Sequence, residues 1–293
     1  MTPEKVLTYS PQVLTQAQRE DYFENGYIKV ENLIPEETLI ELQGVIAKVL
    51  DESRKETKSG SIFDLGPGHS SEIPVLRRLK KPDDYDEVFW NFASGLIADV
   101  AADLAGPDVV FHHSKLNFKW NDGNDDVKWH QDVQFFPHTN YNVFTIGCYL
   151  NDTGMKNGPL GVIPGSHQEK LYDLYHGEDW TGCLNDADAD SLSMKDVEYL
   201  TGGAGSIPIH NCRTLHFSPP SQSVEPRPLL LNCYTSADAK PYTPHPDPSS
   251  HAFSLVRGNP VRWADHDPRP CLIPPDWSGG YTSIFAAQTG ENY

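Results

Sequence analysis

The sequence predicts a mainly β protein, a barrel or jelly roll with helices packed against it. From residue 108 onward, short runs rich in β-branched and aromatic residues alternate with Gly, Pro, Asn and Asp, which is typical of strands joined by turns. The 24 prolines and 22 glycines among 293 residues favour many turns over long helices. The runs that we expect to be strands cover residues 109–119, 127–134, 143–151, 159–163, 204–209, 213–218 and 228–236.

The first hundred residues show helical patterns instead. Thr15 and Gln18 make a capping box that opens a short helix, and Gly26 ends it. Apolar residues then recur at helical spacing in two further segments, and Gly106 and Pro107 end the second. We therefore expect a helix through residue 23, a strand over 27–30 and amphipathic helices over 35–50 and 86–104.

These elements predict one domain over residues 1–293. Helices from about 15–105 are expected to pack on a jelly-roll core of about 108–240. The tail 241–293, rich in proline and aromatic residues, is expected to wrap around that core. The polar segment 53–72, rich in Gly and Ser, is expected to be a loop or a lid.

The formal net charge of −18 makes nucleic acids and anionic membranes poor partner candidates, because such a surface repels them. Cationic or zwitterionic small molecules would be attracted. No run approaches the roughly 18 apolar residues of a membrane span, and residues 1–20 lack an apolar signal core. The five cysteines are odd in number and irregular in spacing, which indicates reduced thiols in a cytoplasmic protein.

The first chemical signal is the run Trp129-His130-Gln131-Asp132. On a strand, residues i and i+2 face the same side, so His130 and Asp132 can point at one metal ion. A second imidazole from a distant strand would complete a facial triad of two histidines and one carboxylate, which leaves three positions open on Fe(II). Alone the pattern is weak, because the chain has 12 histidines and many aspartates.

The second signal lies 84 residues after Asp132, where His216 is followed 11 residues later by Arg227. The histidine, at a strand end, can supply the third metal ligand. The arginine begins the next strand and can form a bidentate pair with the far carboxylate of a dicarboxylate ligand. A surface salt bridge is the other interpretation of Arg227, but the apolar run 228–234 that follows would make an unpaired guanidinium costly there.

Together these residues resemble the phytanoyl-CoA dioxygenase family of Fe(II)- and 2-oxoglutarate-dependent oxygenases. The resemblance covers roughly residues 15–236. It rests on the runs KWHQDVQFFPHTN, NGPLGVIPGSHQ and HFSPPSQSVEPR in the family's order, and on the opening FENGYIKVENLIPEETLIEL. It implies an enzyme with a double-stranded β-helix fold, a cupin-like jelly roll with flanking helices.

The resemblance implies that His130, Asp132 and His216 bind Fe(II), and that Arg227 binds the C5 carboxylate of 2-oxoglutarate, whose other end chelates the metal. Related halogenases have a small residue where this chain keeps Asp132, so hydroxylation with O2 is expected. His210 is the competing distal ligand on the same β-rich segment. It lacks an arginine 11 residues further on, so His216 is favoured.

The strand expected over 111–119 precedes the His-x-Asp strand and, by the resemblance, lines the cavity. Alternation places His113, Lys115 and Asn117 on one face. A lysine and an asparagine on that face can hold an anionic group of the substrate or the cosubstrate. A solvated barrel exterior is the alternative for Lys115.

Two further residues are candidates for the site. Thr145, on the strand expected over 143–151, can donate a hydrogen bond to 2-oxoglutarate. Arg77, in the run LRRL, can either enter the pocket or lie at the surface.

The substrate is predicted from a closer likeness. The runs HHSKLNFKW and QFFPHTN look like those of bacterial members that act on small phosphonates, such as 2-aminoethylphosphonate or its trimethylammonium analogue. Lys115 and Asn117 would take the phosphonate, and Tyr141 and Trp129 would hold the ammonium group. A long-chain acyl-CoA is disfavoured, because the chain shows no basic surface for its phosphates. A secondary metabolite or an amino acid is the alternative substrate class.

Two interpretations come from other classes of protein. A metal-binding cupin that uses no 2-oxoglutarate would not need Arg227. A ligand-binding jelly roll would need neither that arginine nor the metal ligands. Each leaves part of the motif set unexplained, so the oxygenase is the favoured prediction.

Overall fold

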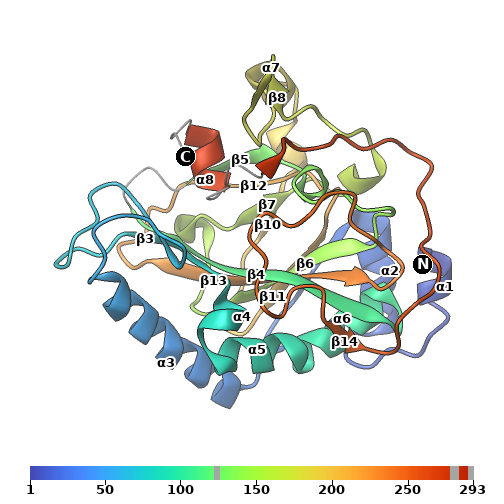
Figure 1. Ribbon diagram of the computed structural model, residues 1–293, viewed down its shortest axis with the longest axis horizontal. Coiled ribbons are helices and arrows are strands. Elements are labelled where there is room, and N and C mark those ends of the chain that lie inside the picture. The colour runs from blue at the N-terminus through green and yellow to red at the C-terminus, as the bar shows by residue number, and fades with distance from the viewer. Residues whose placement is uncertain (122–125, 278–283, 290–293) are drawn as a thin grey trace.

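The computed structural model describes residues 1–121, 126–277 and 284–289. Its centre is a pair of antiparallel sheets, and helices cover the outer side of the larger sheet (Figure 1). The strands of the two sheets are β1 (Tyr27–Val30), β2 (Phe63–Leu65), β3 (Leu76–Lys80), β4 (Val109–Lys119), β5 (Val127–His130), β6 (Val143–Tyr149), β7 (Leu160–Val162), β10 (Glu198–Leu200), β11 (Ile207–Asn211), β12 (His216–Ser218), β13 (Arg227–Ser236) and β14 (Leu255–Arg257).

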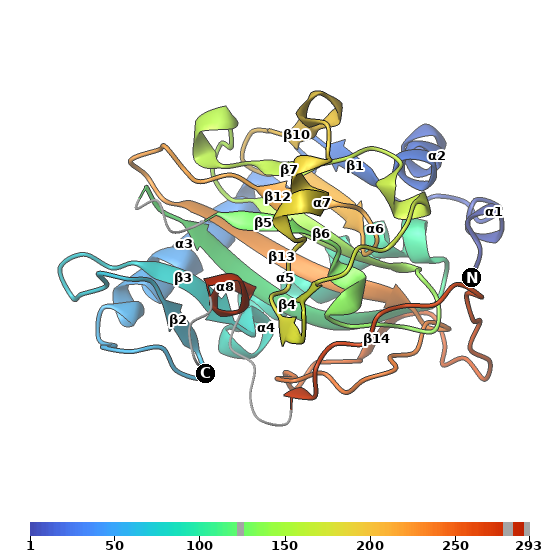
Figure 2. The ribbon, with the colours of Figure 1, turned by 90° about the horizontal axis from the view of Figure 1, so that it is seen from above.

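The order of the strands confirms the predicted fold class. The larger sheet runs β1-β11-β6-β13-β4-β3-β2, with β14 paired to β4, and the smaller sheet runs β10-β7-β12-β5. All of these pairs are antiparallel. Seen from above, the smaller sheet lies across one face of the larger one (Figure 2). A short hairpin of β8 (Tyr175–His176) and β9 (Asp179–Trp180) projects beyond them.

The helices supply the apolar cover of the larger sheet. Their bounds are α1 (Pro3–Val6), α2 (Gln16–Asn25), α3 (Glu36–Ser53), α4 (Pro82–Tyr85), α5 (Glu87–Ser94), α6 (Leu96–Ala105), α7 (Asp186–Asp190) and α8 (Ile284–Thr289). The main hydrophobic core joins Leu42 of α3, Phe89 of α5 and Leu104 of α6 to Leu116 and Leu230 of the sheet, all at most 1 % exposed. The opposite face of the sheet is therefore the one left for polar chemistry.

The capping box of α2 is present as predicted. The Thr15 hydroxyl accepts a hydrogen bond from the Gln18 N–H, and the Gln18 side chain accepts one from the Thr15 N–H. Gly26 ends the helix in the left-handed conformation at φ +80°. Its carbonyl then receives hydrogen bonds from Asn211 and Thr214, which tie the helix to the segment before β12.

Three of the expected elements differ from the sequence prediction, and β3, β8, β9, β10 and β14 lie outside every expected strand. The strand expected over 127–134 ends at His130, because Asp132 begins a short 3-10 turn. The helix expected over 86–104 is two helices, α5 and α6, separated at Gly95. The segment 53–72 is not all loop: it contains β2, whose residues Phe63–Leu65 are all buried where they pair with β3.

The α5–α6 segment, Glu87–Ala105, is long and apolar enough by length and composition to cross a membrane. In the folded chain 61 % of its most apolar window is buried. Core helices commonly meet the same two criteria, and here the segment packs between α3 and the larger sheet.

The edge of β4 is covered discontinuously. Strand β3 pairs with it at Lys115–Asn117, and β14 pairs with it at Val109 and Val110. No described strand pairs with this edge at His113 and Ser114, where α4 and the segment before β14 come close instead. A pocket can therefore reach past the sheet at this point.

The described part of the chain after β13 returns to the two sheets. It supplies β14 to the larger sheet, and its last described element is α8, which lies near β3 and β5 (Figures 1 and 2). The Gln288 side chain accepts a hydrogen bond from the Lys128 N–H and donates one to the Gly182 carbonyl. Arg78 of β3 lies over the Phe285 ring at 5.5 Å.

Gly26 provides a test of how tightly α2 is joined to the sheets. A Cβ at this residue would lie 2.4 Å from the His167 ring and 2.7 Å from the Thr214 hydroxyl, on a backbone with positive φ. We expect Gly26→Ala to lower the free energy of unfolding by about 1–3 kcal/mol. Gly44→Ala is the control, since Gly44 is in α3 with open space around it, and should raise stability by up to about 1 kcal/mol. Urea titration of both variants measures this, and equal stability of Gly26→Ala and wild type would contradict it.

Candidate metal centre and adjoining pocket

Three of the predicted metal ligands lie together between the two sheets. The pairing of β12 with β5 sets His216 directly opposite His130. Their imidazole centroids are 4.0 Å apart, and their Nε2 atoms lie 3.9 and 3.8 Å from Asp132 Oδ1. All three side chains are buried and offer ligand atoms within 4.8 Å of one another.

The two imidazoles are held in the form that binds a metal. The Nδ1–H of His130 donates to the Lys128 carbonyl at 2.8 Å, and that of His216 donates to the Thr214 carbonyl at 2.9 Å, so each Nε2 presents its lone pair to the cluster. Burial lowers the pKa of His130 to about 4 and that of His216 well below its usual range. Two neutral imidazoles and one carboxylate are the donor set that Fe(II) takes in a facial triad.

The carboxylate of Asp132 is fixed by its neighbours. Burial opposes its ionisation, but Lys115 and a hydrogen bond from His210 hold the pKa of Asp132 well below its usual range. His210 Nε2 and the Thr145 hydroxyl lie 3.2 and 3.3 Å from Oδ2, the other oxygen of the carboxylate, and the His210 ring lies 4.4 Å from the His216 ring. Gln131 between the ligands is extended, which keeps Asp132 and His130 on one side although the strand has ended.

A cavity continues from this cluster toward Arg227. Its lining includes Lys115, Asn117, Thr145 and His210 as well as the cluster itself. The Arg227 side chain is 3 % exposed, and its Nη2 donates to the Gly158 carbonyl at 2.9 Å. A planar guanidinium in this cavity can pair with a carboxylate at two points. The face predicted for β4 is therefore observed, and the solvated exterior that was the alternative for Lys115 is wrong.

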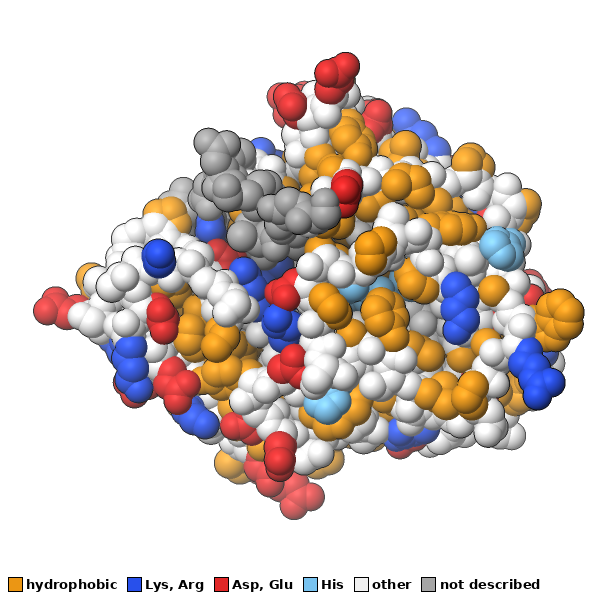
Figure 3. Space-filling view, viewed as in Figure 1, with side chains coloured by type: hydrophobic (Ala, Val, Ile, Leu, Met, Phe, Trp, Pro, Cys, Tyr) orange, Lys and Arg blue, Asp and Glu red, His pale blue; other side chains and the backbone are white. Residues whose placement is uncertain are grey.

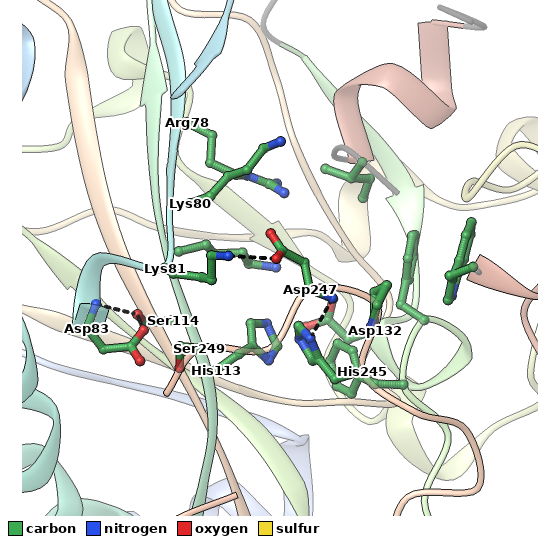
Figure 4. A pocket seen from close by; sticks show the side chains of 16 residues that line it. Arg78, Lys80, Lys81, Asp83, His113, Ser114, Asp132, His245, Asp247 and Ser249 are labelled. Carbon is green, nitrogen blue, oxygen red and sulfur yellow. Dashed lines mark hydrogen bonds and ion pairs between the residues drawn. The ribbon is translucent and has the colours of Figure 1, made fainter. Parts of the chain in front are cut away.

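A second pocket opens on the other side of Lys115. Lys115, Asp132 and Ile284 line both cavities. The second pocket has a basic wall, made by Arg78, Lys80 and Lys81 at the end of β3 (Figure 4). Its aromatic lining comes from Phe135, Phe136 and Trp277. The remaining polar lining includes His113, His245, Asp83, Ser114, Asp247 and Ser249. On the outer face of the molecule, Lys and Arg side chains gather near the middle of the view, next to acidic ones (Figure 3). Although the net charge of the chain is −18, several of its basic side chains are gathered at this pocket.

A second group of three histidines adjoins this pocket, and two of them, His113 and His245, line it. The rings of His112, His113 and His245 have centroids 4.9–5.3 Å apart, and the Nδ1 atoms of His112 and His113 are 2.6 Å apart. Neighbouring residues of a strand normally face opposite sides, but the register of β4 against β13 shifts at this point, as at a β-bulge. Burial lowers the pKa of all three imidazoles, to about 4 for His245, so the group is neutral.

Two aromatic residues singled out in the sequence lie elsewhere. Tyr141 lines a different cavity, where its ring lies under Arg213 and Arg269 at 4.5 and 5.0 Å. Trp129 stacks on Phe217 in a hydrophobic cluster, because alternation along β5 turns it away from His130. The prediction that these two rings hold an ammonium group is therefore not supported by their positions.

Arg77 is neither in the pocket nor at the surface. It is 6 % exposed and pairs with Asp64 at 3.0 Å, while its neighbour Arg78 lines the pocket. The alternation of side chains along β3 places Arg77 and Arg78 on opposite faces, and it could have shown that only one of them faces the pocket. The strand has only five residues, so the alternation is easy to miss in the sequence. Asp83, His245 and Ser249 were also missed, because Asp83 lies in the four-residue helix α4 and the other two lie in the tail, where no strand period fixes the direction of a side chain.

Comparison with known proteins gives one family. The sequence pattern of the family described as phytanoyl-CoA dioxygenase (PhyH) matches residues 22–229. A probable alpha-ketoglutarate-dependent hypophosphite dioxygenase of Stutzerimonas stutzeri is 34 % identical over 238 residues, which cover 76 % of this chain and 79 % of that protein. An ectoine dioxygenase of Sphingopyxis alaskensis is 25 % identical over 245 residues, covering 74 % and 76 %.

Solved structures share the fold. EctD from S. alaskensis with bound Fe superposes with a TM-score of 0.67 at 20 % identity, covering 88 % of this chain and 89 % of that one. The epimerase SnoN, in complex with Fe3+, alpha ketoglutarate and nogalamycin RO, superposes with a TM-score of 0.64 at 20 % identity, covering 86 % and 94 %. The double-stranded β-helix expected from the sequence is confirmed by this likeness.

Buried neutral histidines should make the metal-free protein sensitive to acid. Burial lowers the pKa of His138 to about 4 in the folded chain, against about 6.5 when unfolded. The unfolded state therefore binds more protons between these values, and the free energy of unfolding falls as the pH drops from about 6.5 to about 4. We expect His138→Asn to reduce this slope by up to about 1.4 kcal/mol per pH unit, the value for one proton. Urea titrations between pH 4 and 7 measure the slope, and an unchanged slope would show that His138 is not responsible.

Proposed function

The chain belongs to the phytanoyl-CoA dioxygenase family of Fe(II)- and 2-oxoglutarate-dependent dioxygenases, and from this premise we propose that it hydroxylates a C–H bond of a small phosphonate. A compound of the 2-aminoethylphosphonate type is the proposed substrate. The observation that carries the substrate proposal is the basic wall beside Asp132 in a strongly acidic chain.

We assign His130, Asp132 and His216 as the iron ligands. Their donor atoms converge in a buried space, and the backbone carbonyls behind both imidazoles fix the tautomer that a metal requires. His210 serves in this proposal as the hydrogen-bond partner that orients Asp132 from its other oxygen.

We assign the cavity between the iron ligands and Arg227 to 2-oxoglutarate. Arg227 takes the C5 carboxylate, and the Thr145 hydroxyl lies at the end near Asp132. Bound there, iron and 2-oxoglutarate together supply the activation of O2 that hydroxylates a C–H bond, with succinate and CO2 as co-products.

The residues of the chain position the reactants and limit water. Lys115 lies where the two cavities meet, so its ammonium group can attract both anions toward the metal side of the pocket. Ile284 also borders both cavities, and Phe135 gives the substrate side an apolar wall. Such walls reduce the water around a reacting C–H bond.

The substrate class follows from charge. The side chains of Arg78, Lys80 and Lys81 extend from one strand end toward the pocket, and a group with two or three oxyanion oxygens can contact several of them (Figure 4). The hypophosphite dioxygenase relative is named for a small phosphorus oxyanion, which supports the same class here.

We further propose that residues 1–293 work as one domain in a reducing compartment. Helix α4, the larger sheet and the C-terminal segment all contribute lining to the same pocket. All five cysteines are free thiols, which fits a cytoplasmic location.

The choice between the two distal histidines can be tested with a matched pair of variants. His216→Ala removes a proposed ligand and is expected to weaken Fe(II) binding at least about 10-fold. His210→Ala is expected to weaken Fe(II) binding less, because His210 affects the metal only through its hydrogen bond to Asp132. Anaerobic Fe(II) titration with circular dichroism as the folding check measures both. Iron binding that survives in His216→Ala and disappears in His210→Ala would reverse the assignment.

Arg227 is tested through 2-oxoglutarate alone. Arg227→Ala is expected to raise the Kd of 2-oxoglutarate by about 30-fold or more, since losing one partner of a buried charge pair costs about 2–5 kcal/mol. Arg227→Lys should recover only part of the affinity, because an ammonium group cannot pair in the bidentate way. Fe(II) affinity is the internal control and should stay unchanged. An unaltered Kd in Arg227→Ala would contradict the assignment.

The proposed function is tested by an anaerobic experiment followed by turnover. Fe(II) and then 2-oxoglutarate should produce a visible metal-to-ligand charge-transfer band. On admission of O2, 2-aminoethylphosphonate should raise succinate formation with one hydroxylated product per succinate, while amino acids should not. If the band appears but phosphonate does not stimulate succinate formation, the assignment to the oxygenase class would stand and the phosphonate assignment would be wrong.

A further inference from the structure

We propose that Asp83 and Ser249 form a subsite for a primary ammonium group, so that the substrate pocket selects a zwitterion. The proposal rests on the proposed function, since it assigns the second charged end of a phosphonate substrate. It goes further by naming the residues that distinguish an aminated phosphonate from a simple oxyanion.

The subsite lies where the edge of β4 is left unpaired between β3 and β14. Asp83 reaches this gap from α4, and Ser249 reaches it from the segment before β14. Ser114 of β4 connects them to the sheet: its hydroxyl donates to Asp83 Oδ1 and accepts from the Asp83 N–H at 3.3 Å. The pocket that begins at Asp132 thus extends to a carboxylate behind the strand edge.

Two polar atoms at this end have no partner. Asp83 is 3 % exposed and Ser249 is 9 % exposed, yet neither Asp83 Oδ2 nor Ser249 Oγ has a hydrogen bond within the part of the chain that the structure describes. Buried polar atoms are nearly always paired, so two unpaired atoms lining the same pocket indicate a missing donor. An ammonium group can donate to both.

The charges around the pocket single out Asp83 among its acidic residues. Asp132 belongs to the proposed iron site, and Asp247 is already paired with Lys81 at 2.6 Å. Burial raises the pKa of Asp83, although the hydrogen bond from Ser114 and the nearby Ser249 hydroxyl oppose the shift. A cation placed beside Oδ2 would favour the ionised carboxylate, and none of the described basic side chains forms an ion pair with it.

The chemistry of the subsite favours a primary over a quaternary ammonium. A carboxylate oxygen and a hydroxyl can accept N–H donors, which a trimethylammonium group lacks. A quaternary group would instead bind against aromatic faces, such as Phe135, Phe136 and Trp277, in another wall of the pocket. Binding of a primary ammonium group should therefore depend on Asp83 more than binding of a quaternary one.

The arrangement gives the substrate a direction. In Figure 4, Asp83, Ser114 and Ser249 lie together at one end, Asp132 lies beyond His113 and His245, and Arg78 and Lys80 extend from β3 above them. The phosphonate would lie against the basic side chains and the ammonium group at Asp83.

The test compares three ligands that differ only at the nitrogen end: 2-aminoethylphosphonate, its N,N,N-trimethyl analogue and ethylphosphonate. Their Kd values are measured by calorimetry on the anaerobic enzyme loaded with Fe(II) and 2-oxoglutarate. The wild type should bind the primary amine about 10- to 100-fold more tightly than the other two, as expected for hydrogen bonds to a charged group.

Asp83→Asn should remove most of this preference while leaving the Kd of ethylphosphonate within about twofold. Ser249→Ala should remove a smaller part, and it keeps the test usable should the buried Asp83 variant fail to fold. Asp84→Asn is the matched control: this neighbouring carboxylate binds Ser250 outside the pocket and should leave all three Kd values unchanged.

The outcomes separate the two proposals. Equal binding of all three ligands by the wild type, or a preference for the trimethyl analogue that survives in Asp83→Asn, would overturn the ammonium subsite and leave the phosphonate assignment standing. An equal loss in Asp84→Asn would show a general effect on α4 and would also overturn it. Failure of every phosphonate to bind, with the charge-transfer band intact, would remove the proposed substrate and this inference together.

Discussion

The site depends on one strand pairing, in which β12 lies antiparallel to β5 with His216 opposite His130. Because both Nδ1 atoms are bound by backbone carbonyls two residues earlier in the chain, the sheet itself fixes the direction and the tautomer of each imidazole. Asp132 is added by the short turn that follows β5. The donor set therefore exists as a product of backbone geometry, before any metal is bound.

The charges of the buried side chains distinguish the metal cluster from the neighbouring basic wall. The cluster holds neutral imidazoles and one ionised carboxylate, and Lys115 stands between it and the basic wall at the end of β3. In a chain of net charge −18 this concentration of cations is local, so it can draw an anion to the pocket while the remaining surface repels it. The family's cosubstrate and the proposed substrate are both anionic, and in the proposed arrangement they approach Lys115 from opposite cavities.

The sequence was sufficient where a regular period or a spacing carried the information. The alternation of β4 placed Lys115 and Asn117 on the cavity face, and the 11-residue spacing brought Arg227 to the cavity that begins at His216. It failed where direction depends on irregular backbone. Asp83 follows a left-handed residue at Lys81, and Ser249 lies in the tail, so tertiary packing alone brings them to the pocket. Tyr141 was misplaced for a similar reason, since the turn after Asp132 carries it to another cavity.

The break in the cover of β4 has a consequence for how this scaffold can change. The end that we assign to iron and 2-oxoglutarate is built largely from strands of both sheets, where a substitution disturbs a ladder of hydrogen bonds. The far end of the substrate pocket is built from a short helix and a tail segment outside the sheets. Segments of this kind tolerate replacement. New substrates can thus be acquired by exchanging the second part while the oxidising machinery is inherited intact, and laboratory evolution of the enzyme has its natural target there.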